Sequence, residues 1–75
     1  MVTLLHEGAW RIAVCGREHG VPHFHFEGRG FRCSVGIETL ELIIGAVPPA
    51  ILKSACIWAG EHRMELFAKW RELNE

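Results

Sequence analysis

The sequence predicts an α+β domain in which an antiparallel β-meander of three to four strands precedes a C-terminal helix packed on one sheet face. Three observations lead to this prediction. Apolar and polar residues alternate in the first part of the chain, glycines interrupt the alternation at short intervals, and the apolar period lengthens after Pro48. Short connections favour antiparallel pairing, because parallel strands need long crossovers. With 75 residues, the chain has room for one core and forms a single domain, 1–75.

Alternating segments indicate where the strands lie, at about residues 9–15, 22–28, 31–38 and 40–45. Pro22 fits the start of a strand, because it has no N–H to give to a neighbouring strand. The sequence GRG at 28–30 predicts a hairpin turn. The stretch VTLLH at 2–6 could add one more strand at the N-terminus.

The C-terminal segment has a helical pattern over about residues 48–73. Pro48 and Pro49 suit a helix start, since the first N–H groups of a helix have no partner. The apolar residues recur at spacings of three and four: Ile51, Leu52, Ala55, Ala59, Leu66, Phe67, Trp70 and Leu73. A straight helix over this segment would be roughly 37 Å long, which is longer than the strand of about 20 Å on which it would pack. We therefore expect a kink or split near Gly60, or a projecting end that forms a homodimer through the C-terminal helix.

Strand parity assigns the histidines to one face of the sheet. In PHFHFEG at 22–28, Phe24 and Phe26 point toward the helix, whereas His23 and His25 point the opposite way. By the same rule, one face carries the polar set Arg11, Cys15, His23, His25, Glu27, Arg32 and Ser34. We expect the chemistry of the protein on this face.

Charge and composition narrow the classes of partner and compartment. The formal net charge of −1 predicts no general affinity for nucleic acid. Four arginines and four of the five histidines lie in residues 1–37, so an anionic ligand would bind this half. No apolar run approaches the roughly 20 residues that span a bilayer, so no membrane is expected. The three cysteines lack CxxC spacing, which favours reduced thiols and a cytoplasmic protein.

The first hypothesis for the histidines is a metal site. The Cβ atoms of His23 and His25 should lie about 6.6–7 Å apart on one strand face, so both rings can reach one ion. His19 would be the third ligand and Cys15 or Glu27 a fourth, for zinc or another transition metal. Because the cysteine-rich spacings of structural zinc sites are absent, no cofactor is favoured.

The second hypothesis is metal-independent acid–base chemistry of the kind that cleaves RNA. His23 and His25 would act as acid and base with His19 assisting, because imidazoles exchange protons near neutral pH. Arg32 or Arg17 would neutralise a phosphate. The neighbouring charged residues that would bind the substrate are Arg11, Glu27 and Arg29.

The third hypothesis involves no reaction. An antiparallel sheet covered on one side leaves its other face to water. Histidine, arginine, glutamate and serine are ordinary residues on such a face. The same face would then be a non-catalytic module that binds a protein partner.

Three motifs together resemble a known family. They are the core His19, Pro22, His23, Phe24 and His25, the step Gly45 and Pro48, and the helix signature Trp58, His62, Glu65, Leu66 and Trp70. This combination extends over nearly the whole chain and is similar to the small bacterial DhiT-like family, long grouped as a domain of unknown function. The resemblance implies a toxin of a type II toxin–antitoxin pair, whose partner is a small antitoxin protein encoded nearby. Joined to the acid–base hypothesis, it makes RNA the expected target.

Overall fold

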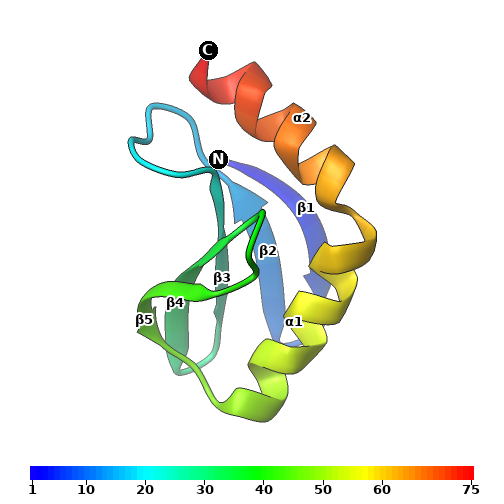
Figure 1. Ribbon diagram of the computed structural model, residues 1–75. Coiled ribbons are helices and arrows are strands. Elements are labelled where there is room, and N and C mark those ends of the chain that lie inside the picture. Colours follow the sequence, from blue (N-terminus) through cyan, green and yellow to red (C-terminus); the bar gives the residue numbers. More distant parts are fainter.

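A computed structural model describes all residues, 1–75, as one antiparallel sheet followed by two helices (Figure 1). The strands are β1 (Val2–Glu7), β2 (Trp10–Val14), β3 (His23–Gly28), β4 (Phe31–Gly36) and β5 (Leu42–Ala46), and the helices are α1 (Pro49–Glu61) and α2 (Arg63–Asn74). Each strand pairs with the next in sequence, so the sheet order is β1-β2-β3-β4-β5. Neither helix is long and apolar enough to cross a membrane.

The predicted α+β meander is confirmed. The N-terminal stretch forms β1 along one edge of the sheet, which brings the number of strands to five. The four predicted strands match β2 to β5, with ends that differ by at most two residues. Glycine-containing connections let β3 turn directly into β4, with Gly28 opposite Phe31 at the end of the pairing.

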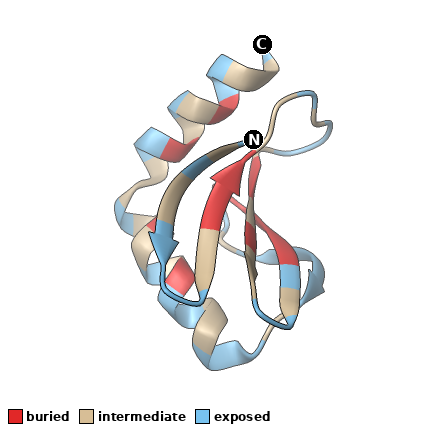
Figure 2. Cartoon of the chain, turned by 180° about the vertical axis from the view of Figure 1, so that it is seen from behind, coloured by how far each residue is buried: buried red, intermediate tan, exposed pale blue.

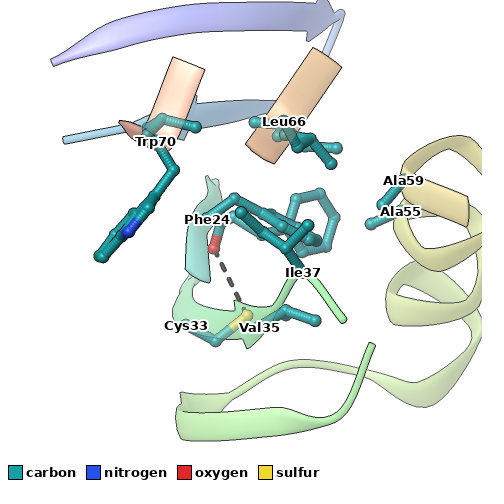
Figure 3. Close-up of a cluster of buried hydrophobic side chains, with 11 residues drawn as sticks. Phe24, Cys33, Val35, Ile37, Ala55, Ala59, Leu66 and Trp70 are labelled. Atoms are coloured by element: carbon teal, nitrogen blue, oxygen red, sulfur yellow. Dashed lines mark hydrogen bonds between the residues drawn. The ribbon is translucent and has the colours of Figure 1, made fainter. Parts of the chain in front are cut away.

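The core lies between the helices and one face of the sheet (Figure 2). Phe24 and Phe26 of β3 are fully buried there, as parity predicts. The helices contribute Ala55, Ala59, Leu66 and Trp70 (Figure 3). The neighbouring strands contribute Ile12, Val14, Cys33 and Val35, and Ile37 comes from the turn after β4. Ala55 and Ala59 of α1 are fully buried in the same cluster as Phe24 and Phe26 of β3, so small side chains on the helix accompany large rings on the sheet.

The expected interruption of the helix occurs at His62, two residues beyond Gly60. His62 leaves helical geometry, with φ of −124° and ψ of 24°. Its Nδ1 donates to the Trp58 carbonyl oxygen at 2.7 Å, and its ring stacks on Trp58 with centroids 4.2 Å apart. The imidazole thus satisfies a carbonyl near the end of α1. Because Leu66 and Trp70 are buried, α2 lies back on the domain and does not project from it.

Strand β5 is the other edge of the sheet and is exposed along its whole length. Its apolar residues Leu42, Ile43 and Ile44 are 42%, 50% and 68% exposed. Gly45 lets β5 approach β4 closely, because its φ is +97° and a Cβ there would lie 2.3 Å from the Arg32 carbonyl oxygen. An apolar edge strand of this kind offers unpaired backbone groups to another strand.

Candidate functional site

The sheet register brings polar side chains from three strands into two rows on the face away from the helices. In the first row, His25 of β3 lies between Ala13 of β2 and Ser34 of β4, and Ser34 lies opposite Ile44 of β5. The second row is two residues away and consists of Arg11, Glu27, Arg32 and Ala46. Antiparallel pairing therefore assembles this face from residues that are far apart in the sequence.

The connection between β2 and β3 carries Glu18 over the first row. This connection is held by Asn74, the last residue of α2. The Glu18 N–H donates to Asn74 Oδ1 at 2.8 Å, and Asn74 Nδ2 donates to the Cys15 carbonyl oxygen at 3.1 Å. Asn74 Nδ2 also donates to the Trp70 carbonyl oxygen at 3.0 Å, which ties the amide to its own helix. The last residue of α2 thereby holds the backbone from which the Glu18 side chain extends.

The Glu18 carboxylate lies between the two imidazoles of β3. Its Oε1 is 2.7 Å from His25 Nε2, and its Oε2 is 3.8 Å from His23 Nε2. On the far side of each ring, His23 Nδ1 is 2.8 Å from the Val21 carbonyl oxygen, and His25 Nδ1 is 3.4 Å from Ser34 Oγ. The two ring centroids are 5.3 Å apart.

When both rings are neutral, these partners assign opposite tautomers to the two histidines. A carbonyl oxygen and a carboxylate oxygen can only accept a hydrogen bond. His23 therefore carries its proton on Nδ1 and donates to Val21, whereas His25 carries its proton on Nε2 and donates to Glu18. As a result, the lone pair on His25 Nδ1 can accept a hydrogen bond from the Ser34 hydroxyl, and the lone pair on His23 Nε2 faces Glu18.

His23 differs from the expectation of an open, solvent-covered sheet face. Its ring packs against Trp70 with centroids 4.8 Å apart, and the residue is only 9% exposed. Parity places His23 correctly, but α2 extends past the end of the strand and covers it. His25, two residues further from that end, is half-buried.

Two hollows meet at His25. The first, which we call the histidine hollow, has a volume of about 370 Å³ and is lined by Glu18, His19, Gly20, Val21, His23, His25, Ser34, Ile43 and Ile44. The second, which we call the serine hollow, has a volume of about 260 Å³ and is lined by His25, Arg32, Cys33, Ser34, Ile44 and Gly45. His25, Ser34 and Ile44 line both, so a ligand in either one would contact the same imidazole.

The second row of the face is a network of ion pairs. Arg11 donates to Glu27 Oε1 through Nε at 2.9 Å and also through its terminal nitrogen, and Arg32 Nε lies 3.4 Å from Glu27 Oε2. The hydrogen bond from Arg11 is the main cause that lowers the pKa of the Glu27 carboxyl below its usual value, and the charges of Arg11 and Arg32 contribute further. The Arg32 side chain is 78% exposed, so its guanidinium can turn toward a ligand.

The other predicted site residues make no hydrogen bond or ion pair with the Glu18 carboxylate. His19 is exposed and lines the histidine hollow. Arg17 is exposed in the β2–β3 connection, where its φ of +59° is unusual for a residue other than glycine. Arg29 is exposed in the turn between β3 and β4, and Arg11 and Glu27 line a third hollow of about 310 Å³ beside Trp10.

The groups that could hold a metal differ from the predicted three histidines. The potential ligand atoms of Cys15, Glu18 and His25 all lie within 4.8 Å of one another. All three cysteines of the chain are unpaired. Burial raises the pKa of the Cys33 and Cys56 thiols, which keeps both as thiols at neutral pH.

Glu18 and Asn74 are the residues that sequence reasoning missed. Glu18 directly precedes the histidine motif, so a carboxylate next to three histidines was a signal for it. No signal in the sequence indicates Asn74, because it is 56 positions away from Glu18 and the two meet only through the fold.

One comparison with known proteins finds a relative of this chain. A family model described as a domain of unknown function (DUF4160) matches residues 10–71. That range includes β2 to β5, both histidines of β3 and nearly all of the two helices. No curated protein and no solved structure matches the chain.

Proposed function

We propose that this chain, which belongs to the DUF4160 family of unknown function, is a DhiT-like toxin of a type II toxin–antitoxin pair that cleaves RNA at the hollows around His25. The observation that carries the proposal is the environment of His25. Its Nε2 is held by Glu18 at 2.7 Å, and its Nδ1 faces Ser34 Oγ at 3.4 Å. An imidazole that is oriented on one nitrogen by a carboxylate and keeps a lone pair on the other, beside a hydroxyl that can move aside for a substrate, has the arrangement of a general base.

The cleavage step needs a base, an acid and a cation near the phosphate. His25 Nδ1 would take the proton of a ribose 2′-hydroxyl as that oxygen attacks the adjacent phosphorus. The bond from phosphorus to the 5′-oxygen then breaks, and the leaving oxygen takes a proton from an acid, leaving a 2′,3′-cyclic phosphate. His19, exposed at the rim of the histidine hollow, can reach solvent and substrate, whereas His23 is packed against Trp70. We therefore assign the acid to His19 and a supporting position to His23.

Arg32 supports a phosphate ester as the substrate. It lines the serine hollow together with His25 and Ser34. Its guanidinium shares Glu27 with Arg11, which keeps it on this face while most of the side chain stays accessible. A bidentate cation at this position would stabilise the charge that builds up on a phosphate during cleavage.

The exposed edge of β5 supports a protein partner. Ile43 and Ile44 line the histidine hollow and are at least half exposed. A strand of the antitoxin added to this edge would form main-chain hydrogen bonds with β5 and bury these side chains. The same strand would cover the entrance to His25, so binding of the antitoxin would block the activity of the toxin.

Expression of the chain without its partner tests the proposal. We expect growth arrest, and we expect His25→Ala to relieve it while His6→Ala, which changes an exposed histidine of β1, does not. The purified protein should cleave an RNA to a cyclic phosphate product and leave the 2′-deoxy version of the same strand intact. Arrest that persists unchanged in folded His25→Ala protein would overturn the assignment of this site.

A further inference from the structure

We propose that Cys15, Glu18, His23 and His25 form a binding site for a divalent transition metal of the zinc type. The potential ligand atoms of Cys15, Glu18 and His25 already lie within 4.8 Å of one another. His23 adds a fourth donor, because its Nε2 is 3.8 Å from Glu18 Oε2. Two donors bound to one zinc ion at about 2.0–2.3 Å lie about 3.3–3.8 Å apart in tetrahedral geometry. The ligand atoms of Cys15, Glu18 and His25 would therefore have to draw closer together, and His23, which lies outside this group of three, would have to turn toward them.

The hydrogen bonds of His23 favour an ion at this position. Because Nδ1 donates to the Val21 carbonyl oxygen, the neutral form of the ring presents the lone pair of Nε2 to the Glu18 carboxylate. Two acceptors that face each other across 3.8 Å repel one another, and a cation between them would turn this repulsion into attraction. A metal-bound histidine usually donates its other ring N–H to a carbonyl or carboxylate, which His23 already does.

His25 needs one change to join the site. In the metal-free protein its Nε2 donates to Glu18 at 2.7 Å. When a metal ion takes Nε2, the single ring proton moves to Nδ1, where Ser34 Oγ can accept it at the observed distance of 3.4 Å. Ser34 would therefore hold the ring in either state, and Cys15 would release its thiol proton to bind the ion as a thiolate.

The donor set selects the class of metal. Sulfur and imidazole nitrogen are poor ligands for magnesium and calcium, which prefer oxygen. One thiolate, one carboxylate and two imidazoles suit zinc, and cobalt(II) takes the same geometry with an absorption spectrum that zinc lacks. The site differs from the set of His19, His23 and His25, since His19 is exposed and Glu18 occupies the place between the rings.

Metal binding would also regulate the proposed RNA cleavage, and this consequence alone rests on the proposed function. With the ion on Nε2 and the proton on Nδ1, His25 has no lone pair for a 2′-hydroxyl proton. The metal-loaded form should therefore not cleave RNA, and removal of the metal should restore cleavage.

Titration of the metal-free, reduced protein with cobalt(II) tests the site without reference to activity. We expect one ion per chain and a near-ultraviolet band from thiolate to cobalt. Cys15→Ser should abolish this band, whereas Cys56→Ser, which changes another half-buried thiol, should keep it. Glu18→Gln and His25→Ala should each weaken zinc affinity about 100-fold or more, and His19→Ala should leave it unchanged.

Several results would overturn the metal site. They are a thiolate band that survives in Cys15→Ser, zinc affinity that is unchanged in Glu18→Gln, or loss of affinity in His19→Ala. Circular dichroism of each variant separates loss of ligands from loss of the fold, and Cys15→Ser serves as the ligand test if a substitution on β3 does not fold. Zinc binding that passes these tests without any RNA cleavage would support the metal site and contradict only the proposed function.

Discussion

Replacement of Asn74 by alanine tests how the end of α2 positions Glu18. The substitution removes the acceptor of the Glu18 N–H at 2.8 Å and the donor to the Cys15 carbonyl oxygen at 3.1 Å. It also removes the contact with the Trp70 carbonyl oxygen within the last turn of the helix, which water can replace. Two long-range hydrogen bonds, each with a net contribution of about 0.5–1.5 kcal/mol, amount to a loss of about 1–3 kcal/mol.

The size of this loss can be measured by thermal and urea unfolding. For a domain of 75 residues, total stability is about 4–11 kcal/mol, so Asn74→Ala should remain folded at room temperature. The unfolding midpoint should fall by about 5–20 °C. Amide exchange should accelerate most at Glu18, whose N–H loses its partner, and little at Leu66 in the middle of α2.

Ser54→Ala is the matched control for Asn74→Ala. It also removes a hydrogen bond from a side chain to a carbonyl oxygen, but this bond joins Ser54 to Ala50 on the exposed side of α1. Its unfolding midpoint should stay within a few degrees of the original. If Asn74→Ala were as stable as Ser54→Ala, with unchanged exchange at Glu18, Asn74 would not hold the connection and the argument would be refuted.

Three further predictions concern the fold. Gly45→Ala should lower the free energy of unfolding by well over the roughly 1–2 kcal/mol of backbone strain expected for the control Gly20→Ala. Both glycines have positive φ, but only at Gly45 would a new Cβ press against a backbone oxygen. Equal urea midpoints for the two variants would contradict this. Gly60→Ala should raise stability by about 0.5–1 kcal/mol, since the new Cβ meets only ordinary contacts, and a lower midpoint would show that the helix needs glycine there. Because the pKa of Glu27 is lowered in the folded state, its pairing with Arg11 stabilises the fold above pH 4.5, and this stabilisation is lost as the pH falls through the pKa of the folded state. Glu27→Gln should therefore be less stable than the original protein at neutral pH, and its stability should fall less steeply as the pH is lowered.

The sheet and the direction of its side chains could be predicted because they depend on local pattern. The alternation around Phe24 and Phe26 is enough to assign the buried face, since side chains in a strand alternate by geometry alone. The start of α1 at Pro49 follows in the same way from the missing N–H of proline. Both results depend on neighbours within a few residues of each other.

The site could be predicted only in part because its key contacts are between distant segments. The burial of His23 depends on Trp70, which follows it by 47 positions in the printed sequence. The place of Glu18 depends on Asn74 at the last turn of α2. The break at His62 depends on a side chain that bonds to the Trp58 carbonyl oxygen, a detail that apolar periodicity does not contain.

The most direct test of the account is the tautomer of each β3 histidine, read by nitrogen NMR of the rings in the metal-free protein at neutral pH. The central claim is that Glu18 organises His23 and His25 into one site through opposite ends of the two rings. We expect His23 to be protonated on Nδ1 and His25 on Nε2, and we expect Glu18→Gln to alter the signals of both rings. The same tautomer on both rings, or rings that do not respond to Glu18→Gln, would contradict the claim.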